Sequence, residues 1–153
     1  MQYGILGNDM QAVKVTLNPG EKIYSDSGKL ISKRGNVVMT PRLVGGILKA
    51  VERKATGATG MLTEFEAQND VGYVSFGGVL PGKIFVVKLG QGEEFIAEHD
   101  AFLAAESSVN GGVGVFLAKF EGKGKVIAHT VSRLKLASDI YTEGLAQMPQ
   151  NKR

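Results

Sequence analysis

The sequence predicts an all-β protein made of two tandem β-sandwich repeats with one short helical insert, and three observations support this fold class. Apolar and polar residues alternate with a period of two through several short segments, as they do in half-buried strands. The chain contains 21 glycines and 4 prolines without a collagen-like period, which indicates many tight turns. The segment 83–109 also repeats the segment 11–37 with a spacing of 72 residues; the identical pairs are Val15/Val87, Leu17/Leu89, Gly20/Gly92, Glu21/Glu93 and Val37/Val109.

The first repeat begins with an alternating strand at 13–17. Asn18-Pro19-Gly20 then predicts a tight turn, because proline presets φ and glycine accepts a positive φ, as in a type II turn. The return strand starts at 23–24, is interrupted by a Ser-Asp-Ser-Gly break, and resumes at 29–33. A further turn leads into a strand at 37–39.

A helical insert is expected at about 41–55. Its residues Leu43, Ile47 and Val51 recur at helical spacing and form one apolar stripe, and Pro41 suits a helix start. The polar side of the insert is basic, so the helix can either lie on an anionic membrane surface or cap a β core with its lysines in water. We favour the second interpretation because the stripe is short and lacks aromatic anchors.

A second block is also duplicated, now with a spacing of 55 residues. Strands expected at 61–67 and 72–76, joined by a polar turn, recur at 115–128. The spacing falls from 72 to 55 because the first copy carries the helical insert. The identical pairs in this block are Leu62/Leu117, Phe65/Phe120, Glu66/Glu121 and Val71/Val126.

The two duplicated blocks follow one another in the same order, which indicates one domain. We interpret residues 1–137 as this domain, with repeats at about 1–77 and 78–137. Residues 138–153 form a C-terminal tail, in which a short helix is expected over Asp139–Met148 with Ser138 as its N-cap.

The repeats differ where polar positions of the first become apolar in the second: Lys14, Lys29, Ser32 and Lys33 correspond to Val86, Ala101, Ala104 and Ala105. A strand that is apolar on both sides is usually covered on both faces, so either the first repeat or a neighbouring subunit must cover the second. We therefore predict a non-enzymatic structural or interaction module that forms a symmetric homo-oligomer. Its expected contacts are Ile84, Val86, Phe102, Leu103, Leu43, Ile47 and Val51.

A second hypothesis is a ring protein that binds anions or nucleic acid. The formal charge of +3 and the pI near 9.1 are mildly basic, which is well short of a nucleic-acid signature. Most of the phenylalanines occupy alternating positions typical of a core rather than of base stacking, among them Phe85, Phe95, Phe116 and Phe120. The basic residues available for anions are Lys49, Arg53, Lys54, Lys119, Lys123 and Lys125.

Enzymatic chemistry has little support in the sequence. A cupin-type metal enzyme, the remote third hypothesis, needs an H-x-H pair on one strand, whereas the chain has only His99 and His129. Asp26, Glu98 or Asp100 could join them as ligands, but alternation would place Glu98 and Asp100 on one strand face and His99 on the other. No G-x-S-x-G elbow or phosphate-binding glycine motif is present. We expect no catalysis, no cofactor and no metal.

The composition limits the cellular setting. The chain has no cysteine, so disulfides and thiolate metal sites are excluded. No apolar run approaches the roughly 18 residues that a membrane-spanning helix requires, and the first residues do not resemble a secretory signal. We expect a cytoplasmic protein.

Several motifs together resemble a known family. They are GNDMQAVKVTLNPGEKIYSDSGKLI near the start, GGILK in the insert, VLPGKIFVVKL at the entry to the second repeat, and FIAEHDAFLAAESSV. The likeness covers about residues 1–130 and is to the AIM (altered inheritance of mitochondria) mitochondrial-biogenesis family, a prokaryotic group of unknown function. The resemblance implies a fold like that of the tryptophan RNA-binding attenuation protein, with short β-sandwich repeats related to the double-stranded β-helix. It implies no catalytic residues. Typical members carry three repeats, whereas two are found here, which favours assembly between chains.

Overall fold

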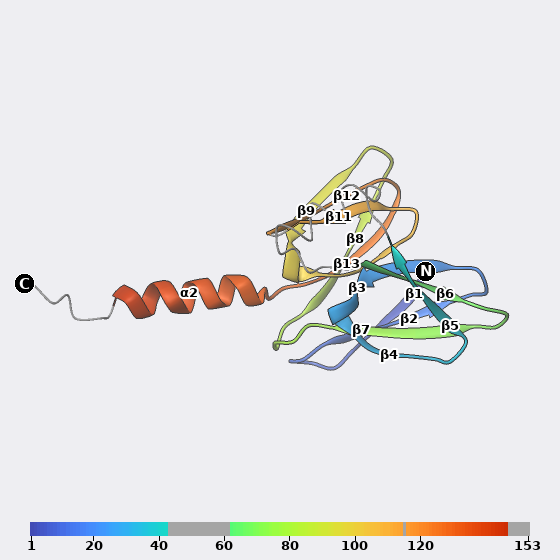
Figure 1. Cartoon of the computed structure of the whole chain (residues 1–153), viewed down its shortest axis with the longest axis horizontal. Coiled ribbons are helices and arrows are strands. Elements are labelled where there is room, and N and C mark those ends of the chain that lie inside the picture. Colours follow the sequence, from blue (N-terminus) through green and yellow to red (C-terminus); the bar gives the residue numbers. More distant parts are fainter. Residues whose placement is uncertain (43–61, 115, 147–153) are drawn as a thin grey trace, which may run out of the picture.

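The computed structural model describes residues 1–42, 62–114 and 116–146, and these form β-strands in three antiparallel sheets followed by one α-helix (Figure 1). The expected all-β class is confirmed. Strand β1 (Gln2–Leu6) precedes the first repeat, and helix α2 (Arg133–Ala146) follows the second. Among the described residues, no helix is long and apolar enough to cross a membrane.

Among the described residues, each repeat has six strands and one 3-10 turn in the same order. The first contains β2 (Ala12–Leu17), β3 (Lys22–Asp26), η1 (Ser27–Lys29), β4 (Leu30–Lys33), β5 (Val37–Arg42), β6 (Leu62–Ala67) and β7 (Gly72–Gly77). The second contains β8 (Ile84–Leu89), β9 (Glu94–Glu98), η2 (His99–Ala101), β10 (Phe102–Glu106), β11 (Asn110–Val113), β12 (Leu117–Glu121) and β13 (Gly124–His129).

The two repeats pair their strands in the same way. Each places its first strand beside its last and then its third, in the orders β2-β7-β4 and β8-β13-β10. Each also forms a second sheet, in the orders β5-β6-β3 and β11-β12-β9. A register shift interrupts the β4–β7 ladder between Leu30 and Ser32, and the same shift interrupts the β10–β13 ladder between Phe102 and Ala104. The duplication inferred from the sequence is therefore a duplication of structure.

One expected correspondence between the repeats is wrong. The sequence match without gaps made Val71 the equivalent of Val126. In the structure, Val126 pairs with Val87, and Val74 pairs with Val15, which is the equivalent of Val87. Val74 is thus the structural equivalent of Val126. The connection between β12 and β13 (122–123) is two residues shorter than that between β6 and β7 (68–71), and β12 is one residue shorter than β6. A match without gaps therefore misplaces β13 by three residues.

The expected helix start at Pro41 is also wrong. Pro41 and Arg42 belong to β5, where they pair with Thr63 and Leu62 of β6. Proline is tolerated there because β5 is the edge strand of its sheet. The remainder of the expected insert, with Leu43, Ile47 and Val51, lies outside the described residues.

The core lies between the sheets and consists of two clusters. One, around Phe65 and Phe76, belongs mainly to the first repeat and packs these rings edge to face with centroids 5.3 Å apart. The other, around Phe102 and Phe120, belongs mainly to the second repeat. The expectation of a core position fails for Phe116, which is exposed because it lies in the loop before β12.

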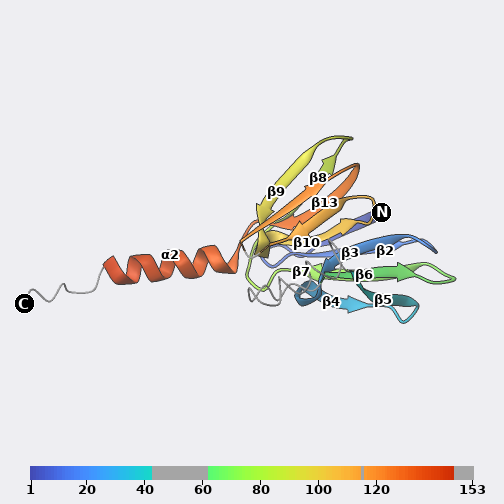
Figure 2. The same ribbon diagram turned by 45° about the horizontal axis from the view of Figure 1, so that its top comes forward.

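Helix α2 starts earlier than the sequence suggested and projects from the body of the protein (Figure 1, Figure 2). Its N-cap is Ser132, whose hydroxyl oxygen accepts a hydrogen bond from the Lys135 amide at 3.3 Å, rather than Ser138. Both serines are good caps in isolation. The side chain of Arg133 pairs with Asp100 of the body, and this contact anchors the first helical residue.

Candidate functional site

In the described part of the chain, one pair of strands joins the two repeats. Strand β3 of the first repeat runs antiparallel to β10 of the second, with Ser25 opposite Ala104 and Tyr24 opposite Ala105. This pairing fuses two three-stranded sheets into the continuous sheet β5-β6-β3-β10-β13-β8. Ala104 and Ala105 are fully buried here, and the Ser25 hydroxyl donates a hydrogen bond to the carbonyl of Leu103. For these two alanines, the first repeat supplies the cover that the sequence required.

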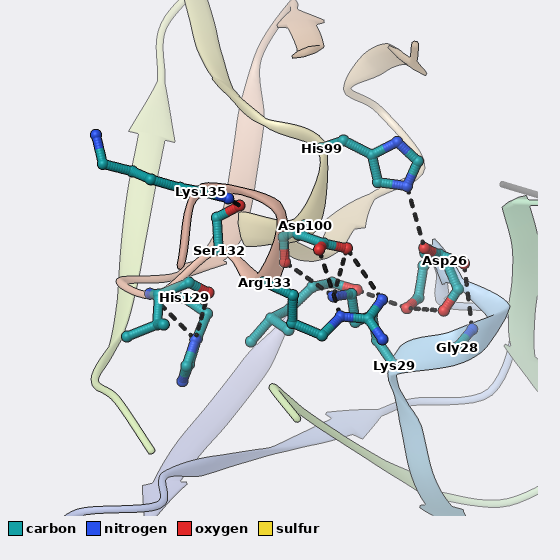
Figure 3. A network of polar contacts seen from close by, with 12 residues as sticks. Asp26, Gly28, Lys29, His99, Asp100, His129, Ser132, Arg133 and Lys135 are labelled. Carbon is teal, nitrogen blue, oxygen red and sulfur yellow. Dashed lines mark hydrogen bonds and ion pairs between the residues drawn. The ribbon is translucent and has the colours of Figure 1, made fainter. Parts of the chain in front are cut away.

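A buried polar network lies beside this junction (Figure 3). The Lys29 ammonium is enclosed in the protein and donates to the carbonyl oxygen of Asp100 at 2.8 Å, and it lies 3.6 Å from Oδ1 of the same residue. Arg133 approaches that carboxylate from helix α2 at 3.2 Å. One carboxylate of the second repeat therefore holds a lysine of the first repeat and the start of the C-terminal helix.

A second charged pair crosses the junction. Nε2 of His99 lies 3.7 Å from Oδ2 of Asp26, and Nδ1 of His99 lies 2.6 Å from the carbonyl oxygen of Gly114. The contact with Asp26 raises the pKa of His99, against the opposing effect of burial. Burial alone would raise the pKa of Asp26, but the contact with His99 and the hydrogen bond from the Gly28 amide lower it. The pair is thus electrostatically favoured in its charged form.

The same balance holds for the other carboxylate. Burial would raise the pKa of Asp100, but the hydrogen bonds from Arg133 and the charge of Lys29 lower it overall. Each of these polar groups is therefore engaged with another residue of the protein, as buried charged groups generally must be.

The residues considered for a cupin-type metal site do not assemble into one. The expected alternation fails after Glu98, because η2 follows it and residues 99–101 form a turn rather than a strand. His129 lies apart from His99, and its Nδ1 is close to the Val131 carbonyl oxygen (Figure 3). Within the described part of the chain, no three His, Cys, Asp or Glu residues are grouped as metal ligands.

The internal junction has no counterpart at two equivalent strands. Strand β4 corresponds to β10 and strand β9 corresponds to β3, yet each ends its sheet, with no further strand beside it among the described residues. Ile31 on β4 is 59% exposed, whereas its equivalent Leu103 on β10 is 0% exposed. Ile96 on β9 is 53% exposed, whereas its equivalent Tyr24 on β3 is 0% exposed. What one repeat buries at the junction, the other presents to solvent.

Further apolar side chains surround the β9 edge. Phe85 and Leu117 are exposed, although their first-repeat equivalents Val13 and Leu62 are buried. A groove of about 400 Å³ runs along this surface; its lining includes Phe85, Phe95, Ile96, Ala97 and Glu98. Exposed apolar residues that gather in one place typically mark an interaction surface.

The residues expected to contact another subunit prove to be mostly core residues. Phe102 and Leu103 are fully buried within the single chain and Ile84 nearly so, because the packed sheets of the two repeats enclose them. These three positions are corrected, since a side chain without exposed surface cannot touch another copy. Val86 is half-buried against the core. Leu43, Ile47 and Val51 lie outside the described residues. The sequence analysis did not identify Ile31 and Ile96 as candidate contact residues, although comparing the two repeats position by position could have indicated them.

The residues expected to bind anions are only partly described. Lys119 is exposed but forms ion pairs with Glu94 at 2.6 Å and with Glu121 at 3.4 Å, which offset its charge. The Lys125 ammonium donates to the carbonyl oxygen of Met1, and Lys123 is exposed. The other three, Lys49, Arg53 and Lys54, lie outside the described residues. Anion binding stays a prediction.

Comparison with known proteins agrees with this architecture. The family model described as "Mitochondrial biogenesis AIM24" matches residues 3–141. A search of curated proteins finds no match. The crystal structure of protein SPYM3_0169 from Streptococcus pyogenes is similar in fold, with a TM-score of 0.67 and 22% sequence identity. The similarity covers 86% of this chain but only 65% of that one.

Proposed function

We propose, from the premise that this chain belongs to the mitochondrial biogenesis AIM24 family, that the protein is a non-enzymatic module that self-associates into a symmetric oligomer. The observation that carries the proposal is the difference in burial between equivalent residues. Ile31 and Ile96 are exposed, while their equivalents Leu103 and Tyr24 are buried where the two repeats meet. Covering such side chains would contribute roughly 25 cal/mol for each Å² of apolar surface removed from water.

The non-enzymatic part of the proposal is supported by the role of the polar residues at the junction. Lys29, Asp100 and Arg133 hold one another, and Asp26 holds His99, so these charges link structural elements. The pKa values of Asp26, His99 and Asp100 are shifted by these same ion pairs and hydrogen bonds. The pKa values of titratable groups in structural ion pairs shift in this way without any catalytic role. A cytoplasmic location of the module remains a prediction from the sequence.

The test is the mass of the native protein in solution, measured by light scattering over a tenfold range of concentration. We expect a fixed multiple of the chain mass of 16.3 kDa. Ile96→Asp should shift the mass towards that of one chain, because it places a charge on the surface that the partner would cover. Val79→Asp is the matched control, since Val79 is equally exposed but lies in the loop between β7 and β8. A wild-type protein that stays at the mass of one chain throughout would refute the proposal.

A further inference from the structure

The internal symmetry of the chain identifies two strand edges that match each other. Six strands end a sheet among the described residues: β1, β4, β5, β8, β9 and β11. Strands β5 and β11 are equivalent, so the symmetry supplies no partner for either. The equivalent of β8 is β2, which β1 covers. Only β4 and β9 have equivalents, β10 and β3, that pair with one another.

We infer that the β4 edge of one copy of this chain pairs antiparallel with the β9 edge of a second copy, repeating between chains the junction that β10 and β3 form within one. This inference rests on the proposed self-association and names the two surfaces that carry it. Within a chain, β9 lies in the upper part of the body and β4 in the lower part in both views, so one copy does not pair its own two edges (Figure 1, Figure 2).

The internal junction also predicts the register of the new one. Ala104 lies opposite Ser25, and Ala105 lies opposite Tyr24. Transferring these pairs to the equivalent positions places Ser32 opposite Ala97 of the next copy, and Lys33 opposite Ile96. Small residues again face each other at the first pair, as serine and alanine do inside the chain.

The charges at the two edges are complementary in this register. Strand β4 ends in Lys33, and Arg34 follows it, whereas β9 begins and ends with Glu94 and Glu98. A residue on one strand has two diagonal neighbours on the same face of the facing strand, two positions before and two positions after its direct partner. Lys33 opposite Ile96 would therefore lie between Glu94 and Glu98. A carboxylate in place of the Lys33 ammonium would instead repel Glu94 and Glu98.

This pairing is head to tail, because each copy uses a different edge at each contact. Such heterologous contacts build closed rings when the rotation between copies closes, and filaments when it does not. A twofold-symmetric dimer, by contrast, would pair β4 with β4 or β9 with β9. The two arrangements place different residues opposite each other, so they can be told apart.

Disulfide cross-linking tests the arrangement directly, because the native chain has no cysteine. Residues opposite each other on antiparallel strands have Cα atoms about 4.5–5.5 Å apart, within the range of a disulfide. The doubly substituted chain, Ser32→Cys with Ala97→Cys, should form covalent multimers on mild oxidation, while each single variant should stay at the mass of one chain on a denaturing gel without reductant. Ser32→Cys with Val38→Cys is the control, since Val38 is an exposed residue on the β5 edge, and it should not cross-link.

Charge reversal provides a second measurement on the same register. Lys33→Glu and Glu98→Lys should each raise the dissociation constant of the oligomer about tenfold or more, because each places like charges side by side. The chain with both reversals should recover most of the lost affinity.

The outcomes separate this inference from the proposed function. Cross-links within the single variants would show twofold pairing of like edges and overturn the head-to-tail arrangement. An oligomer of unchanged mass that gives no cross-link in the double variant would also overturn it, while self-association itself would stand. A protein that is monomeric at every concentration would overturn both.

Discussion

The ammonium nitrogen of Lys29 lies 3.6 Å from the carboxylate oxygen Oδ1 of Asp100, and the two buried residues come from different repeats. Their positions in the sequence are not equivalent, since the second-repeat equivalent of Lys29 is Ala101. The ion pair at the junction between the repeats therefore has no equivalent elsewhere in the duplicated sequence.

Removing this lysine should destabilise the protein strongly. Lys29→Ala leaves the buried Asp100 with Arg133 alone, and breaking a buried ion pair by removing one partner typically costs about 3–5 kcal/mol. Urea unfolding should show this loss in the free energy of unfolding. Lys88→Ala, on the exposed face of β8, should change that free energy by no more than about 0.5 kcal/mol. Equal effects of the two substitutions would contradict a structural role for the pair.

Stability should depend on pH through Asp26 and His99. The pKa of His99 is raised above 6.5, so its contribution is complete below that pH and disappears as the pH rises through the raised value. The pKa of Asp26 is lowered below 3.8, so its contribution is present above that pH and disappears as the pH falls through the lowered value. The stabilising effect of the pair should therefore be greatest between these two pH values.

His99→Gln measures this contribution. The difference in free energy of unfolding between the wild type and this variant should be larger at about pH 5.5 than at about pH 9, because His99 loses its charge in between. Asp26→Asn should reduce this pH dependence, since Asp26 provides the largest contribution to the raised pKa of His99. If Asp26→Asn kept the full slope, the pair would not be its source.

Equivalent residues of the two repeats should tolerate truncation very differently. Leu103→Ala removes a fully buried side chain and should cost about 3 kcal/mol, the typical value for a leucine cavity. Ile31→Ala, at the equivalent position, should cost less than about 1 kcal/mol because Ile31 is largely exposed. Thermal unfolding at a concentration low enough to keep one chain per particle would compare the two. Similar losses would show that the β4 edge is covered within the chain.

The turn glycines should be equally sensitive in both repeats. Gly20 and Gly92 occupy equivalent turns and have positive φ values of 80° and 77°. An alanine at either position has space for its Cβ but must adopt a left-handed backbone, which should cost about 1–2 kcal/mol. Gly35→Ala is the control, because its surroundings are equally open and its φ is not positive. The midpoint of urea unfolding would reveal the difference.

By itself, the sequence determined the all-β class, the duplication and the turn chemistry. These properties are local or periodic: alternation marked the strands, and the repeated Gly20 and Gly92 marked equivalent turns. The spacing of 72 residues relates β2 to β8, which pair with the equivalent strands β7 and β13. The motifs also indicated the family that the matched residues 3–141 show.

The tertiary structure alone decided which apolar residues are core and which are surface. Leu103 and Ile31 are alike in sequence pattern. They differ because β3 pairs with β10 on the side away from β13, whereas no described strand pairs with β4 on the side away from β7. The burial of Lys29 against Asp100 and the contact of Arg133, the first residue of α2, with Asp100 also depend on segments that are distant in the sequence. Periodicity reports that a side chain has an apolar face to bury, but only the packing of the whole chain determines whether anything covers it.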